Sequence, residues 1–134
     1  MKKTTHNKLV RDKIPNILIK KGLAFKASKV SSPEMRVKLA DKLIEEATEV
    51  RDRVSWFYHL GCQEPMSNAE CDGHINAILE EMADVLEVYV SLAKELEIST
   101  EDIFKTCDTK RRERGGFEDG IFLEWVEEDK GSNS

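Results

Sequence analysis

Two short acidic segments hold the residues of this chain that are best placed to do chemistry. The first contains Glu45, Glu46 and Glu49, and the second contains Glu81 and Asp84. At about 100° per residue, Glu46 points along the apolar stripe of one predicted helix and Glu81 falls within an apolar arc of another. Carboxylates are rarely buried unless they are paired or bound to a cation. The pattern therefore indicates a cation site, the alternative being two ordinary solvated helix faces.

The spacing of these carboxylates also indicates which cation would suit them. Side chains three or four apart share a helix face, so Glu46 converges with Glu49, and Glu81 with Asp84. If the two helices pack together, the carboxylates surround one point, and hard oxygen ligands suit Mg²⁺, with Mn²⁺ as a second possibility. A di-iron bundle would need Glu-x-x-His on the helices, and neither helix has a histidine at that offset. Magnesium held by a few carboxylates usually serves a phosphate substrate.

Basic residues near both ends of the chain could hold phosphates that a metal leaves exposed. Lys110, Arg111 and Arg114 lie at the end of a predicted helix, and Arg11 and Lys13 lie near the amino terminus. The alternatives are a basic helix end that complements the helix dipole and a local ion pair within the amino-terminal segment. The sequence lacks the Gly-x-x-x-x-Gly-Lys-Ser/Thr segment of P-loop enzymes.

Two further groups of residues have a possible role beside an ordinary one. Trp56 and Phe57 follow the first acidic segment closely enough to form a wall for a nucleobase, although aromatic residues at such positions more often serve packing. Cys71 and His74, with Cys62, have spacing that zinc ligands use. Because the set lacks a second tight pair, free thiols are the preferred interpretation.

The apolar periodicity predicts an all-α fold, mainly an antiparallel helical bundle. One long helix is predicted from Ser32, its N-cap, with Pro33 at the first helical position, to about residue 60; a second runs from about residue 73 to 96. The second helix is apolar around much of its girth, which predicts burial on two sides, in a bundle or an oligomer. The other predicted segments are a short helix over 15–22, a loop over 61–74, a helix over 99–114, and a short β-hairpin or extended arms near 23–30 and 117–126.

Length and composition bound the class of protein. A chain of 134 residues fits one domain, residues 1–134, with a polar, disordered tail over 127–134. The net charge of −5 argues against a nucleic-acid polymer as partner. No apolar run approaches the ~18 residues that a membrane span needs, and no signal peptide opens the chain. Three cysteines at irregular spacing suit a reducing cytoplasm better than a disulfide framework.

The acidic segments also match the motif of a known family. Residues 45–49 read Glu-Glu-Ala-Thr-Glu and residues 81–84 read Glu-Met-Ala-Asp. The chain resembles the all-α nucleoside triphosphate pyrophosphohydrolases of the MazG-like superfamily, most nearly the small house-cleaning or phosphoribosyl-ATP-pyrophosphohydrolase-like branch. Residues 7–15 and 110–118 are also similar to that branch, so the likeness covers 7–123. The interval between the two motifs is longer than the family usually shows, because of residues 55–74.

The resemblance implies a helical bundle, assembled as a homodimer or homotetramer, that hydrolyses a nucleoside triphosphate to the monophosphate and pyrophosphate. It implies Mg²⁺ ligands at Glu46, Glu49, Glu81 and Asp84, with Glu45 as a further ligand or as the base that orients water. Glu45, Glu46 and Glu49 are then the catalytic candidates, and the basic groups named above hold phosphates. A phosphoribosyl-ATP pyrophosphatase is the rival enzyme, and a non-catalytic helical module that binds nucleotide or a partner protein is the rival of another class.

Overall fold

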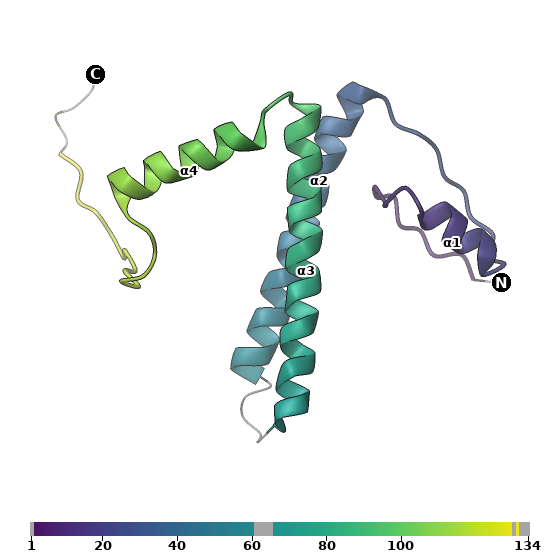
Figure 1. Ribbon diagram of the computed structural model, residues 1–134, viewed down its shortest axis with the longest axis horizontal. Helices are drawn as coiled ribbons and strands as arrows, with labels where there is room; N and C mark the ends of the chain where they lie inside the picture. The colour runs from purple at the N-terminus through teal and green to yellow at the C-terminus, as the bar shows by residue number, and fades with distance from the viewer. Residues whose placement is uncertain (1, 61–65, 130, 132–134) are drawn as a thin grey trace. The chain divides into compact units, whose positions relative to one another are not determined.

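The computed structural model describes residues 2–60, 66–129 and 131, and its regular structure is entirely helical (Figure 1). None of these residues forms a strand, so the predicted all-α class is confirmed. The chain divides into two compact units, Met1–Thr100 and Glu101–Ser134, which are described separately. That residues 1–134 form a single domain therefore stays a prediction. In chain order the elements are α1 (Ile14–Lys20), α2 (Ser32–Ser55), the π-helix η1 (Trp56–Leu60), α3 (Asn68–Glu95) and α4 (Thr100–Arg114).

The first unit is built on a hairpin of two long antiparallel helices, α2 and α3, which lie side by side (Figure 1). Leu39 of α2, Phe57 of η1, and Val88 and Ala93 of α3 are its buried apolar residues. One carboxylate, Glu46, is buried among the described residues as well. The apolar stripe of α2 thus faces α3 as the periodicity predicts, and it carries Glu46 into the interface.

The boundaries of α2 differ slightly from the prediction. The N-cap is Ser31 rather than Ser32, since Ser31 has extended backbone angles and its carbonyl accepts from the Met35 N–H at 2.8 Å. The α-helical geometry ends at Ser55, and the chain continues as the π-helix η1 to residue 60. Helical structure therefore ends near residue 60, as predicted, but its last turn is a π-helix and not an α-helix.

The start of α3 was predicted about five residues too late. Residues 68–74, expected in a loop, form the first two turns of this helix. A capping box explains the early start: the Glu70 N–H donates to the Ser67 hydroxyl at 3.2 Å, and the Ser67 N–H donates to the Glu70 carboxylate at 3.0 Å. These two bonds satisfy amide groups that a helix start leaves open. The rest of the predicted loop includes residues 61–65, which lie outside the described part of the chain.

The helix ends at α1 and α3 use the same pattern of bonds with different residues. At α1, Gly22 has a φ of 69°, and the Leu23 N–H donates to the Leu18 carbonyl at 3.0 Å. At α3, the Ile98 N–H donates to the Ala93 carbonyl at 2.9 Å. Here the residue in the left-handed region is Glu97, with a φ of 57°. Glycine adopts this backbone conformation without strain, whereas a residue with a side chain adopts it at a cost in free energy.

Residues 23–30 and 117–126 contain no regular structure. Of the two alternatives proposed for them, the hairpin is not formed by the described residues and irregular arms are observed. In the second unit, α4 ends at Arg114 before Gly115, as predicted. Residues 127–129 at the start of the predicted tail are irregular and exposed.

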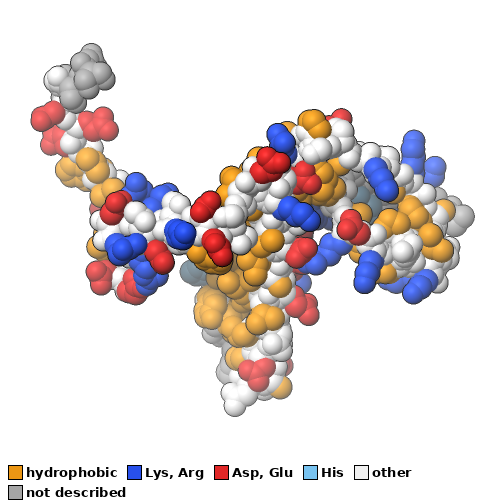
Figure 2. Space-filling view, turned by 45° about the horizontal axis from the view of Figure 1, so that its top comes forward, with side chains coloured by type: hydrophobic (Ala, Val, Ile, Leu, Met, Phe, Trp, Pro, Cys, Tyr) orange, Lys and Arg blue, Asp and Glu red, His pale blue; other side chains and the backbone are white. Residues whose placement is uncertain are grey.

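One face of α3 remains uncovered within the chain. Its apolar side chains are 41–62% exposed, and we call them the outer stripe: Ile75, Leu79, Met82, Leu86 and Val90. Figure 2 shows hydrophobic side chains gathered on the exposed surface of the hairpin. Within the chain this helix is therefore covered on one side, and burial of its other side in an oligomer stays a prediction. No helix in the described part of the chain combines the length and apolarity needed to cross a membrane.

Candidate active site

Three carboxylates from the two long helices converge at the α2–α3 interface. One oxygen from each of Glu46, Glu81 and Asp84 lies within 4.8 Å of the other two. We call these residues the carboxylate triad. The Glu46 residue is only 6% exposed, and the other two are half-buried. The predicted convergence of the two acidic segments is thus present in the hairpin geometry.

The triad fits a small divalent cation. Oxygens on opposite sides of one Mg²⁺ ion, each at 2.0–2.1 Å, lie about 4.2 Å apart. The three triad oxygens lie within 4.8 Å of one another, at most about 0.6 Å beyond this distance, and small side-chain rotations can bring them into one coordination sphere. Carboxylate oxygens are also the ligands that hard cations prefer. The donor set therefore suits a divalent metal ion.

Glu49 lies beside the triad and interacts with Glu81. A hydrogen bond with Glu81 raises the pKa of Glu49 above its usual value, and burial and the negative charge of Glu81 act in the same direction. A hydrogen bond with Glu46 opposes this increase but does not cancel it. Two neighbouring carboxylates resist ionising together, and a cation bound between them would remove that conflict.

Lysines neutralise the Glu45 end of the group. Lys42 forms ion pairs with Glu46 at 2.9 Å and with Glu45 at 3.1 Å, and Lys8 donates to Glu45 at 3.1 Å. Burial of Lys42 lowers its pKa, but the hydrogen bonds to Glu46 and Glu45 outweigh burial and leave that pKa raised. Burial likewise raises the pKa of Glu45, and the hydrogen bonds from Lys8 and Lys42 outweigh it, so the Glu45 pKa is lowered.

Arginines pair with the other two members of the triad. Arg11 donates to Asp84, and Arg53 forms an ion pair with Glu81 at 3.5 Å. With Lys42 on Glu46, each triad carboxylate therefore has one basic partner. These cations offset part of the repulsion within the triad, and a divalent ion would compete with them for the same oxygens.

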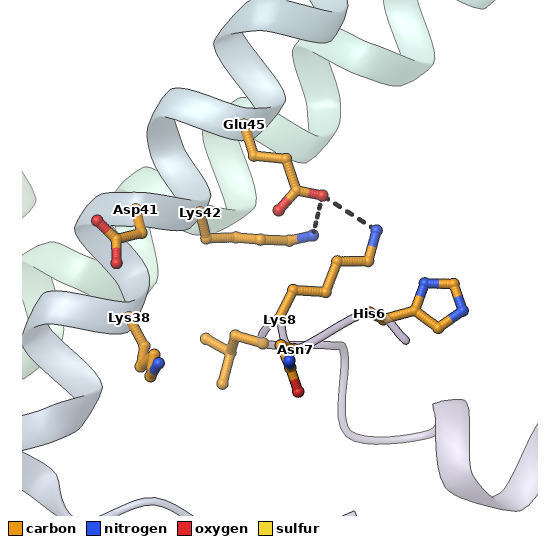
Figure 3. Close-up of a pocket in the computed structure, with 8 residues that line it drawn as sticks. His6, Asn7, Lys8, Lys38, Asp41, Lys42 and Glu45 are labelled. Atoms are coloured by element: carbon orange, nitrogen blue, oxygen red, sulfur yellow. Dashed lines mark hydrogen bonds and ion pairs between the residues drawn. The ribbon is translucent and has the colours of Figure 1, made fainter. Parts of the chain in front are cut away.

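Two hollows flank the carboxylates along α2. One, of about 420 Å³, is lined by Glu49, Asp52, Arg53 and Glu81. The other, of about 340 Å³, lies between α2 and the amino-terminal segment and includes Glu45 (Figure 3). Both volumes lie near the lower end of the range for small-molecule sites.

The described residues provide one aromatic cluster near the first hollow, where η1 meets α3. Trp56 lies against His74, with ring centroids 4.6 Å apart, and Phe57 lies 5.3 Å from the same ring. Trp56 is 47% exposed, whereas Phe57 is 7% exposed and belongs to the core. Of the two residues predicted to face a nucleobase, only Trp56 presents its ring to solvent.

Comparison with known families identifies the family to which the chain belongs. A family model, described as the MazG nucleotide pyrophosphohydrolase domain, matches residues 36–116, more than half of the chain. The chain belongs to the MazG family. As a member, it is a hydrolase that acts on a diphosphate bond of nucleotides. No curated protein and no solved structure matches the chain.

The MazG match covers both acidic segments and α4, but not the amino-terminal residues that resemble the same branch. Arg11 nonetheless contacts the triad, through Asp84. Lys13 is exposed and forms the N-cap position of α1. Lys110, Arg111 and Arg114 are exposed on the last turns of α4, in the second unit, where Arg111 pairs with Glu118. Their role in phosphate binding stays a prediction.

Three basic residues at the site were not identified from the sequence. Lys42 precedes Glu45 by three positions and Glu46 by four, so helical spacing alone could have indicated its ion pairs. Arg53 is similarly four positions after Glu49, on the face that turns toward Glu81. Lys8 offers no such signal, because its partner is 37 residues away.

Proposed function

We propose that the protein hydrolyses nucleoside triphosphates to the monophosphate and pyrophosphate, with Mg²⁺ as the preferred ion and Mn²⁺ as a substitute. The observation that carries this proposal is the carboxylate triad, set across two helices of a MazG-family chain. The physiological task that fits best is removal of non-canonical or excess nucleotides in the cytoplasm.

In this proposal Glu46, Glu49, Glu81 and Asp84 hold the metal, which neutralises triphosphate charge and lowers the pKa of the attacking water. Glu45 is either a further ligand or the group that orients the water. The lowered pKa of Glu45 favours orientation over proton abstraction, because a weak base accepts a proton poorly.

Basic side chains hold the phosphate oxygens that the metal leaves exposed. The proposed residues are Lys110, Arg111 and Arg114 of α4, together with Arg11 and Lys13. Arg11 is supported by its contact with Asp84, since a guanidinium there can exchange a carboxylate for a phosphate.

The outer stripe supports assembly as a homodimer or homotetramer. Five large apolar side chains along one helix face form the kind of exposed patch that marks an interaction surface. Light scattering on the purified protein tests this, and a monomer at every concentration would refute it.

The deciding experiment incubates the protein with canonical and modified triphosphates and with phosphoribosyl-ATP, each with Mg²⁺, and measures pyrophosphate and monophosphate. Turnover of a triphosphate, lost in Glu81→Gln and kept in the exposed control Glu80→Gln, is the expected result. Turnover confined to phosphoribosyl-ATP would favour the rival enzyme. No turnover of any substrate would leave a non-catalytic binding module as the better interpretation.

A further inference from the structure

A second hollow beside the carboxylates has a composition that the metal does not explain. It lies between the first half of α2 and the amino-terminal segment, and its volume is about 340 Å³ (Figure 3). Three lysines line it, Lys8, Lys38 and Lys42, together with the carboxylates of Asp41 and Glu45. The charged groups of the lining are three cations and two anions, and Glu46, which pairs with Lys42, balances the third cation. An anion would therefore bind here through a lysine without a carboxylate partner, or through a lysine that exchanges its carboxylate for the anion.

The lysines differ in what they already bind. Figure 3 shows the ammonium groups of Lys8 and Lys42 directed at one oxygen of Glu45, each at 3.1 Å. Lys38 lies one turn before Lys42 on the same face of α2, and it forms no ion pair with any residue that the structure describes. Lys38 is thus the cation most available to an incoming anion.

Lys42 connects this hollow to the carboxylate triad. It lines the hollow and also pairs with Glu46 at 2.9 Å, while its side chain is only 15% exposed. A divalent cation that takes Glu46 as a ligand competes with this ion pair. Lys42 would then be released toward the hollow, where a phosphate oxygen can replace the lost carboxylate partner. Filling the metal site and filling the hollow are therefore expected to favour one another.

The two ends of α2 offer contrasting surroundings for a bound nucleotide. The Lys38 end is lined mainly by charged groups, which suit a small polyanion, and the aromatic ring in its lining is that of His6, an exposed residue of the irregular amino-terminal segment. Beyond the triad, the first hollow, of about 420 Å³, is lined by Arg53, and Trp56 lies one turn further along with its ring half-exposed.

We propose that the hollow around Lys8, Lys38 and Lys42 binds the pyrophosphate end of the substrate, so that the nucleotide lies along α2 with its nucleoside toward Arg53 and Trp56. This inference rests on the proposed triphosphate hydrolysis and adds a direction to it. The metal site then lies at the bond to be broken, with the leaving pyrophosphate on the lysine side.

The test measures the affinity of two product-like ligands by calorimetry in excess MgCl₂: inorganic pyrophosphate and the nucleoside monophosphate of the best substrate. Lys38→Gln removes the charge of an exposed side chain and should weaken pyrophosphate binding about tenfold, the effect of one charge-assisted contact. The same variant should change monophosphate binding by less than about twofold. Lys26→Gln, an exposed lysine in an irregular segment away from the lining of the hollow, should change neither affinity.

Each result separates the inference from the function on which it rests. Unchanged pyrophosphate affinity in Lys38→Gln, in a protein that does hydrolyse triphosphates, would overturn the direction and leave the function intact. So would a larger loss for the monophosphate than for pyrophosphate. Selective weakening of pyrophosphate binding in a protein with no hydrolytic activity would support the anion site and refute triphosphate hydrolysis.

Discussion

Replacing Asp84 with Asn tests the carboxylate triad most directly, because it removes a charge and a ligand while conserving side-chain shape. Asp84 belongs to two of the three carboxylate pairs within 4.8 Å. Because the oxygens of each pair are no farther apart than 4.8 Å, each pair costs at least about 0.9 kcal/mol in a water-like dielectric and at least about 3.5 kcal/mol at an effective dielectric constant of 20. The Asp84 side chain is 37% exposed, so the lower figure applies. Relief of repulsion is then worth about 2 kcal/mol for the two pairs together.

The same change removes the ion pair with Arg11. Both partners are substantially exposed, so this loss is worth less than about 1 kcal/mol. We therefore expect Asp84→Asn to be more stable than the natural protein by about 1 kcal/mol when no divalent cation is present. For a chain of this size that is about 4 °C in Tm.

Addition of Mg²⁺ should reverse this order. A cation at one hundred times its Kd stabilises the natural protein by about 2.7 kcal/mol, or about 10 °C. Loss of one of the four proposed carboxylate ligands should reduce this increase to less than half. Thermal unfolding followed by circular dichroism, first in EDTA and then in MgCl₂, measures both quantities on one sample.

The reversal separates loss of a metal ligand from general damage to the fold. Glu80→Gln removes an exposed carboxylate from the same helix and should keep both the stability in EDTA and the full response to Mg²⁺. A variant Asp84→Asn that is less stable in EDTA than the natural protein would refute the repulsion argument. One with an undiminished Mg²⁺ response would place the cation elsewhere.

Three further predictions concern the pH, the core and a helix end. Because Glu49 has a raised pKa, protons compete with the metal: calorimetry should show Mg²⁺ affinity rising as the pH climbs through that pKa, and Glu49→Gln should abolish this dependence. In the absence of metal, stability depends on pH in the opposite direction. The contribution of Glu49 to the free energy of unfolding is full below the pKa that it has in the unfolded chain, and it is lost as the pH rises through its raised pKa in the folded protein. Leu39→Ala, at a position 3% exposed, should cost 2–5 kcal/mol in urea unfolding, whereas Val37→Ala at 62% exposure should cost less than about 0.5 kcal/mol; equal losses would mean that the α2–α3 interface is misassigned. Glu97→Gly should stabilise the protein by about 1 kcal/mol, because its φ of 57° suits glycine, and a loss of stability in urea would contradict that explanation.

The part of the site that sequence could predict is the part set by helical periodicity. Glu46 lies on the apolar face of α2, so its burial follows from positions only three and four residues away. Pairing α2 with the face of α3 that carries Val88 then brings Glu81 and Asp84 to the same place. The apolar arc of α3 is too wide for the sequence to select that face over the outer stripe. The family motif at residues 45–49 and 81–84 predicts the same convergence of carboxylates.

The amino-terminal contacts could not be derived in this way. Arg11 meets Asp84 across 73 residues, and Lys8 meets Glu45 across 37. Such contacts depend on where an irregular segment crosses the hairpin, which no local period encodes. Sequence could suggest that basic residues serve the site, but it could not assign each one to its partner.

The prediction for the start of α3 was wrong for a different reason. Gly73 and several small polar residues favour a turn by composition, while Ser67 and Glu70 form a capping box whose spacing was available in the sequence. The cap fixes two otherwise unsatisfied amides, and its directional bonds outweigh the weak preferences of the residues that follow. The Ser67–Glu70 pair therefore starts the helix earlier than the composition of residues 68–74 predicts.

The outer stripe has a consequence for how the enzyme would behave on dilution. It lies on the same helix as Glu81 and Asp84, so whatever covers that face also restrains two members of the triad. If a second copy covers it, as we propose, assembly and cation binding act on one helix, and where ordering that helix favours both, each strengthens the other by the same factor. A dilute sample would then need more Mg²⁺ to reach half-saturation than a concentrated one. Any measured metal affinity would therefore depend on the protein concentration at which it is measured.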